Sequence, residues 1–391
     1  MVGNPTVCRM DAGDTVRVMS APKFSVTRNP APASLQRRAD VLAAPGFGRY
    51  MTDHMVTIRW TAGTGWHDPA VVPYGPLTLD PSSMVLHYGQ EIFEGLKAYR
   101  QPDGSIASFR PDANAARFAG SARRLAMAEL PEELFLASLS ELLAVDSEWV
   151  PEAGGEDSLY LRPFMIATEV GLGVRPSSEY LYAVIASPAG PYFAGGVQPM
   201  DVWLETEYTR AALGGTGTAK CGGNYAASLL PQSVGAQHGC AQVAYLDAEE
   251  RQWIDEMGSN NLFFVFRGDD GSVEIATPDL RGSVLAGITR DSLITVAEDL
   301  GMSVVERRIS GQEWLGGAAS GVLTEAFGCG TAAVITPIGT VKHSGGEVTI
   351  GNGEPGPVTL QLRDALTAIQ RGAAPDPHGW MHTLVPASAS V

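Results

Sequence analysis

The segment with the clearest potential for chemistry places one lysine in a run of glycines. Residues 214–225 read GGTGTAKCGGNY, with Lys220 at the centre and Tyr225 five positions later. Glycines at this density allow the backbone to approach a bound group closely and to adopt positive φ angles. A lysine that only faces solvent on a helix would not need such a loop.

Three interpretations of this segment are open. A phosphate-binding loop of nucleotide-binding proteins requires G-x-x-x-x-G-K-[ST], but Ala219 and Cys221 occupy two of its four fixed positions. Alternatively, Lys220 is a nucleophilic amine that forms a Schiff base with an aldehyde cofactor, in surroundings whose desolvation lowers its pKa. The third interpretation is a flexible, glycine-rich surface loop.

Other parts of the chain contain side chains that suit an anionic ligand. Arg117 lies beside the apolar stripe of a predicted helix, and Glu256 lies in a hairpin directly before the apolar strand NLFFVF. Tyr160 and Arg162 share one face of a predicted strand, where such a pair is costly unless it holds an anion. The GIT turn at 287–289 begins a helix whose free N–H groups form an anion site. Taken singly, each also fits an ordinary structural role.

Composition indicates an ordinary globular protein. The 391 residues are 45% hydrophobic and 18% charged, and the formal net charge of −16 argues against nucleic-acid or anionic-membrane binding. The N-terminus lacks an apolar signal region, and no stretch of about 18 apolar residues is present. The four cysteines are scattered without metal-binding spacing, which is typical of a reducing cytoplasm; they are Cys8, Cys221, Cys240 and Cys329.

The length favours two domains. Residues 1–45, rich in proline and alanine, are expected to be a poorly ordered lead-in, followed by a first domain over 46–189. The proline- and glycine-rich segment 190–200 is the expected interdomain loop, and 201–391 is the second domain, which carries the lysine.

Periodicity predicts the elements that position these residues. An antiparallel sheet opens the first domain, and residues 86–100 are expected to begin extended and end in a strand. Predicted strands include 55–60, 158–168 and 180–187. One predicted helix begins at Pro111, and others cover about 132–147, 225–238 and 357–371. A further helix is expected to open at the GIT turn (287–289) and to close at Gly301.

One cofactor suits this set of residues. Pyridoxal phosphate needs an amine for its aldehyde, cations and backbone N–H groups for its phosphate, and an anionic partner for its pyridine nitrogen. Periodicity and spacing do not show that these residues converge.

The chain resembles the branched-chain-amino-acid aminotransferases, which are fold-type IV pyridoxal-phosphate enzymes. The resemblance covers roughly residues 45–380. Its motifs occur in the family's order: FGRYMTDHM (47–55), LHYGQEIFEGLKAYR (86–100), LYLRPFMIATEVGLGV (159–174), AKCGGNYAASLL (219–230), EMGSNNLFFV (256–265), GITRDSL (287–293) and FGCGTAAVITP (327–337).

The resemblance implies an α/β (α+β) fold with a small α/β domain and a larger domain with a β-barrel-like core. It implies that Lys220 forms the Schiff base and later moves the proton between substrate Cα and cofactor C4′. The remaining implied cofactor contacts are Glu256 at the pyridine nitrogen, Tyr225 at the ring hydroxyl, Ser259 in support of Tyr225, and Arg117, Ile288, Thr289 and Thr331 at the phosphate.

The same resemblance implies transfer of an amino group between leucine, isoleucine or valine and 2-oxoglutarate, in a homodimer with shared sites. The implied substrate-binding residues are Phe47, Tyr88, Phe93, Tyr160, Arg162, Tyr192, Thr331 and Ala332. Alternatives are a D-amino-acid aminotransferase or aminodeoxychorismate lyase within the fold, a phosphate-loop kinase, and a non-catalytic vitamin-B6-binding protein.

Overall fold

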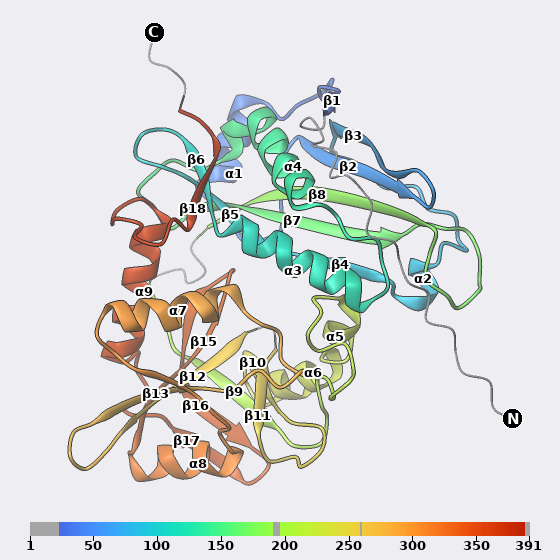
Figure 1. The fold of residues 1–391 in the computed structure, drawn as a ribbon. Helices are drawn as coiled ribbons and strands as arrows, with labels where there is room; N and C mark the ends of the chain where they lie inside the picture. The colour runs from blue at the N-terminus through green and yellow to red at the C-terminus, as the bar shows by residue number, and fades with distance from the viewer. Residues whose placement is uncertain (1–22, 191–195, 259, 388–391) are drawn as a thin grey trace, which may run out of the picture.

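The computed structural model describes residues 23–190, 196–258 and 260–387. Within these residues the chain forms two nine-stranded sheets, which lie one above the other in Figure 1. Helices cover both sheets, so the architecture is the mixed α/β arrangement expected from the sequence.

The first sheet has the order β1-β3-β2-β8-β7-β5-β6-β18, with β4 paired to β7. β1 and β3 pair in parallel, and the other pairs are antiparallel. Its strands are β1 (Ser25–Val26), β2 (His54–Thr61), β3 (Gly65–Pro73), β4 (Glu91–Phe93), β5 (Leu96–Arg100), β6 (Ile106–Phe109), β7 (Ser158–Ala167), β8 (Glu179–Ala189) and β18 (Met381–Val385).

Helices α3 (Pro111–Arg124) and α4 (Glu132–Val145) pack on this sheet (Figure 1). Both helices bury an apolar face, as the ring centroid of Phe118 lies 5.7 Å from that of Phe135 and 5.6 Å from that of Tyr182 on β8. Burial of these aromatic side chains stabilises the upper half of the molecule.

Strand β7 alternates between buried and partly buried residues along its length. Leu159 and Leu161 join the core beneath the helices. Because strand side chains alternate between faces, Tyr160 and Arg162 lie together on the opposite face, as their spacing predicts.

The second sheet has the order β11-β10-β9-β16-β15-β12-β13-β14, with β17 paired to β16. It curls around a buried cluster to which Val202, Phe264 and Trp314 contribute. Its strands are β9 (Met200–Glu205), β10 (Gln242–Leu246), β11 (Ile254–Met257), β12 (Asn261–Arg267), β13 (Val273–Thr277), β14 (Val304–Glu306), β15 (Leu323–Gly330), β16 (Val334–His343) and β17 (Gly346–Thr349).

A third apolar cluster joins the two sheets. Helices α7 (Ile288–Asp299) and α9 (Pro357–Gln370) pack beside the second sheet, and their apolar side chains meet Tyr99 and Phe109 of the first sheet. The shorter helices are α1 (Leu35–Ala43), α2 (Val85–Tyr88), η1 (Ser147–Trp149), α5 (Gly222–Ala226), α6 (Leu229–Gln237) and α8 (Gly311–Ser320).

Most of the long elements predicted from periodicity are present, but three local predictions are wrong. Residues 35–43 of the expected lead-in form α1, whose N-terminus is capped by Ser34 through the N–H of Arg37. Residues 85–88 form helix α2 instead of extended chain. The helix predicted over 225–238 divides into α5 and α6, because Pro231 has no N–H to donate to the carbonyl four residues before it.

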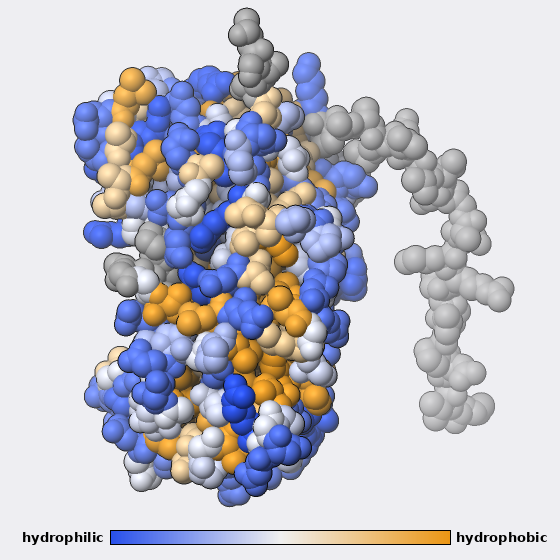
Figure 2. All heavy atoms as spheres, turned by 90° about the vertical axis from the view of Figure 1, so that its left-hand side faces the viewer, coloured by the Kyte–Doolittle hydropathy of each residue, from blue (hydrophilic) through white to orange (hydrophobic). Residues whose placement is uncertain are grey.

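The chain also returns to the first sheet at its end. Strand β18 pairs with β6 in the first sheet, although its residues belong to the expected second domain over 201–391. Hydrophilic residues dominate the face shown in Figure 2, and hydrophobic ones gather mainly in its lower half. Among the helices of the described residues, none has the length and hydrophobicity needed to cross a membrane.

Candidate active site

The glycine-rich segment lies between the two sheets. The backbone N–H of Lys220 donates to the Ser121 hydroxyl on α3 (2.9 Å), and its carbonyl accepts from the N–H of Phe93 (3.0 Å). A Cβ atom at Gly217 would lie 2.1 Å from the carbonyl oxygen of Ser283. Glycine is therefore needed where the segment packs against the chain before α7, while the hydrogen bonds with Ser121 and Phe93 hold Lys220 against the first sheet and its helix.

The Lys220 amine lies in a cleft between the sheets. Its Nζ donates to the Tyr225 hydroxyl (2.9 Å) and lies 5.0 Å from the ring centroid of Phe93. Burial, and then the positive charge of Arg117, lower the pKa of Lys220 to about 8. At neutral pH a larger share of this amine is neutral, and hence nucleophilic, than in an ordinary lysine.

Glu256 provides a buried carboxylate in the same cleft. The residue is only 2% exposed, and its Oε2 accepts from Arg210 (3.0 Å) and from the N–H of Leu285 (3.2 Å). Burial raises the pKa of Glu256, whereas the charge of Arg210 opposes the rise. Arg210 therefore gives the carboxylate the ionic and hydrogen-bonding partner that a buried charge requires.

A second buried carboxylate orients Arg117. Glu94 is fully buried and accepts from Nε and Nη2 of Arg117 at 2.7 and 2.9 Å, and from the Asn114 amide at 2.7 Å. Burial alone would raise the pKa of Glu94, but Arg117 and the hydrogen bonds together hold it below its usual value. The remaining Nη1 of Arg117 donates to the carbonyl of Ala286, directly before the GIT turn (3.1 Å).

Arg117, Lys220 and Glu256 line one cleft. Residues from α3, the glycine-rich segment, the second sheet and the N-terminus of α7 line it: Arg117, Lys220, Glu256, Asn261, Leu285, Gly287, Ile288, Thr289, Cys329, Gly330 and Thr331. The guanidinium, the threonine hydroxyls and the N–H groups at the start of α7 suit a phosphate. The Lys220 amine suits an aldehyde, and the buried Glu256 carboxylate suits a protonated ring nitrogen. The residues present therefore fit pyridoxal phosphate.

An aromatic cluster adjoins the amine. The ring centroids of Phe47 and Tyr160 are 4.9 Å apart, and those of Phe93 and Tyr225 are 5.0 Å apart. Arg162 joins these pairs, since its guanidinium carbon lies 4.9 Å from the Phe93 centroid and its Nη2 donates to the Tyr160 hydroxyl (2.9 Å). The cluster combines an apolar wall with one cation.

The sequence-predicted residues are therefore largely brought together around Lys220. Tyr88 lies on α2, where its hydroxyl donates to the carbonyl of Leu172, and Ala332 lies in the turn between β15 and β16. Tyr192 and Ser259 fall outside the described residues.

Sequence reasoning did not identify Glu94 and Arg210. A charged residue inside the apolar run IFEGL was a signal for Glu94, because buried charges need partners. For Arg210 no comparable signal is present, since its ion pair with Glu256 joins segments far apart in the chain.

Comparisons with known proteins agree with the fold and the cleft. The family model described as Amino-transferase class IV matches residues 91–341. The branched-chain-amino-acid aminotransferase of Mycolicibacterium smegmatis is 62% identical over 93% of this chain and 98% of its own length.

Two solved structures are similar as well. The Escherichia coli branched-chain amino acid aminotransferase superposes with a TM-score of 0.66 and 27% identity, over 84% of this chain and 99% of that chain. A T.th. branched-chain amino acid aminotransferase with pyridoxamine 5′-phosphate gives a TM-score of 0.66 and 29% identity, over 84% and 98% of the two chains.

The fold is thus that of a class IV aminotransferase. Within that class, the chain belongs to the branched-chain-amino-acid aminotransferases.

The lowered pKa of Lys220 generates a pH prediction. Only the neutral amine attacks an aldehyde, so reconstitution of the apoenzyme with pyridoxal phosphate should accelerate as pH rises, with a midpoint near 8 instead of 10.5. Stopped-flow absorbance measures this rate, and the same aldehyde reacting with Nα-acetyl-lysine controls for its own ionisation. A midpoint equal to that of the free amine would contradict the lowered pKa.

Proposed function

We propose that this enzyme reversibly transfers the amino group between leucine, isoleucine or valine and 2-oxoglutarate, with pyridoxal 5′-phosphate as cofactor. The observation that carries the proposal is the buried Lys220 amine, held between an anion-binding end of the cleft and the buried carboxylate of Glu256. When bound, pyridoxal phosphate supplies an aldehyde and an electron-accepting ring.

The chain's own residues divide the work of binding this cofactor. Glu256, kept in place by Arg210, would hold the protonated ring nitrogen, and Tyr225 would donate to or accept from the ring hydroxyl. The phosphate would be held by the guanidinium, hydroxyls and helix N–H groups of Arg117, Ile288, Thr289 and Thr331. Ser259 is assigned to the support of Tyr225 by resemblance.

Lys220 is proposed to act as the base and acid of the reaction. Its amine takes the proton from substrate Cα when it is neutral and returns a proton when it is charged. A pKa of about 8 suits both tasks near neutral pH, because neither form is rare. The Phe93 ring beside the amine limits access of water on one side.

The aromatic cluster is proposed to recognise the substrate. Phe47, Phe93 and Tyr160 supply apolar surface for branched aliphatic side chains, to which resemblance adds Tyr88 and Tyr192. The α-carboxylate would be held by the Tyr160 hydroxyl and the backbone amides of the turn that contains Thr331 and Ala332. Apolar walls separate neighbouring aliphatic substrates by only ~1–3 kcal/mol per methylene, so all three branched amino acids should react.

Replacing the lysine tests the proposed function most simply. Lys220→Ala should lower transamination of leucine and 2-oxoglutarate by at least about 10³-fold, because one amine supplies both the nucleophile and the proton carrier. Coupled product assays measure this loss, with circular dichroism to check folding. Lys342→Ala, at an exposed lysine, should keep the parent rate; a Lys220→Ala variant that does the same would refute the role.

Arg162 is proposed to hold the distal carboxylate of glutamate, because it is the cation within the aromatic cluster. Arg162→Gln should slow the glutamate half-reaction by about 10- to 100-fold, the effect of losing a charged hydrogen bond. The leucine half-reaction should stay within about 3-fold of the parent rate by the same energetic scale. Stopped-flow measurement of both decides; equal losses would show that Arg162 serves both substrates alike.

We further propose a homodimer in which each subunit completes its partner's site. Support comes from exposed apolar residues near Tyr88, since Leu172 is 63% and Val174 is 83% exposed. Val174→Glu should therefore shift sedimentation towards monomer and lower activity, whereas Leu35→Glu, exposed elsewhere, should leave both unchanged. A parent enzyme that sediments as a fully active monomer would disprove the dimer.

A further inference from the structure

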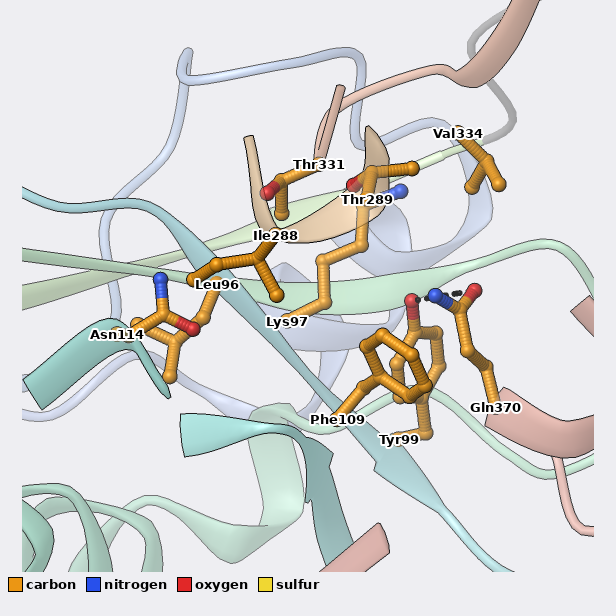
Figure 3. Close-up of a pocket in the computed structure, with 10 residues that line it drawn as sticks. All are labelled: Leu96, Lys97, Tyr99, Phe109, Asn114, Ile288, Thr289, Thr331, Val334 and Gln370. Carbon is orange, nitrogen blue, oxygen red and sulfur yellow. Dashed lines mark hydrogen bonds between the residues drawn. The ribbon is translucent and has the colours of Figure 1, made fainter. Parts of the chain in front are cut away.

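A second cavity lies directly beside the active-site cleft. It is small and shares Ile288, Thr289 and Thr331 with the cleft. Figure 3 shows Lys97 running across this cavity from strand β5, so that its amine lies at the end lined by Thr289 and Thr331. The proposed function assigns no role to Lys97.

Lys97 links the first sheet to a turn of the second. Its Nζ donates to the carbonyl oxygen of Ala332 at 2.7 Å, in the turn between β15 and β16. On the first sheet Lys97 pairs in register with Tyr160 of β7, and the hydroxyl of Ser108 donates to its carbonyl (2.8 Å). One side chain therefore connects the strand next to Tyr160 with the turn that faces it.

The environment of Lys97 makes its positive charge costly to maintain. Burial, and then the positive charge of Arg371, lower the pKa of Lys97 to about 8, against a partial opposing effect of Glu156. A buried ammonium is expensive unless its hydrogen bonds are well formed. The short contact with Ala332 is the interaction that offsets part of this cost.

The turn itself has a strained exit. Val334, the first residue of β16, has a φ of 62°, and it pairs with Gly330 across the turn. A β-branched residue in this left-handed region is a genuine outlier, and such conformations persist only where the surroundings hold them. Val334 lines the same cavity as Lys97 (Figure 3), and the carbonyl held by Lys97 lies two residues before it.

We propose that Lys97 is a positioning residue that fixes the Thr331–Ala332 turn from the first sheet, so that the turn's amides are set for the substrate α-carboxylate. This inference rests on the proposed function, in which those amides and Tyr160 bind that carboxylate. Because leucine and 2-oxoglutarate both carry an α-carboxylate, Lys97 serves both half-reactions equally, unlike Arg162.

The test compares Lys97→Met, Lys97→Gln and Lys97→Arg in the holoenzyme. The first two both remove the cation, and Lys97→Gln also shortens the side chain. Both should raise KM for leucine and 2-oxoglutarate alike by about 10- to 100-fold, with a much smaller change in kcat. Binding of 4-methylpentanoate, the leucine skeleton without its amine, should weaken by the same factor in a calorimetric titration. Lys97→Arg, which keeps the charge and donors, should recover most of the affinity.

A structural readout separates this inference from the proposed function. Amide hydrogen exchange over residues 328–336 should accelerate by about 10-fold or more in Lys97→Met without any substrate present. Cofactor affinity should fall much less than substrate affinity, because Thr331 is only one of the residues proposed to hold the phosphate. Lys342→Met serves as the matched control, because Lys342 also donates to a backbone carbonyl, that of His238, but on the surface.

These measurements distinguish failure of the inference about Lys97 from failure of the proposed function. If the parent enzyme transaminates leucine but Lys97→Met and Lys97→Gln match it in KM, analogue binding and exchange, Lys97 does not position the turn. Loss of cofactor affinity in place of substrate affinity would also overturn the inference. If exchange accelerates as expected but the parent enzyme does not react with leucine, the proposed function fails while the contact between Lys97 and the turn stands.

Discussion

The buried pair between Glu94 and Arg117 is the contact on which the arrangement of the cleft depends. Glu94 lies between β4 and β5, whereas Arg117 comes from α3, and two parallel hydrogen bonds fix the plane of the guanidinium. This orientation leaves Nη1 to reach the carbonyl of Ala286, directly before α7 of the second half. Removing one partner of such a pair typically costs ~3–5 kcal/mol, because the other charge remains buried. The pair therefore fixes the guanidinium at the anion-binding end of the cleft.

Charge is concentrated in the cleft of a chain that carries a formal net charge of −16. Two arginines in the cleft region have carboxylate partners, Arg117 with Glu94 and Arg210 with Glu256, and both arginines remain charged at any accessible pH. The two half-buried lysines, Lys97 and Lys220, instead donate to a carbonyl and a hydroxyl, and burial lowers the pKa of each to about 8. The two arginines thus orient their carboxylate partners. The two lysine amines, which can lose their charge, lie where substrate and cofactor are proposed to bind.

Much of the fold and the candidate site could be predicted from local sequence signals. Alternation along β7 correctly placed Tyr160 and Arg162 on one face, and the glycines around Lys220 correctly indicated close packing. Contacts between distant segments could not be predicted this way. The Arg210–Glu256 ion pair and the Lys97–Ala332 hydrogen bond join residues far apart in the chain, and no regular spacing in the sequence indicates them. Helix α1 was not predicted because the composition around residues 35–43 is typical of a loop. In the structure, Ser34 caps a helix there.

The cleft around Lys220 is proposed to carry out the amino-group transfer itself. This role is tested most directly by recording the visible absorbance of the holoenzyme before and after leucine is added without an acceptor. The account predicts that the cofactor band is lost, that one equivalent of 4-methyl-2-oxopentanoate is released per active site, and that 2-oxoglutarate then restores the band. A holoenzyme whose band is unchanged by leucine, with no oxo acid released, would contradict it.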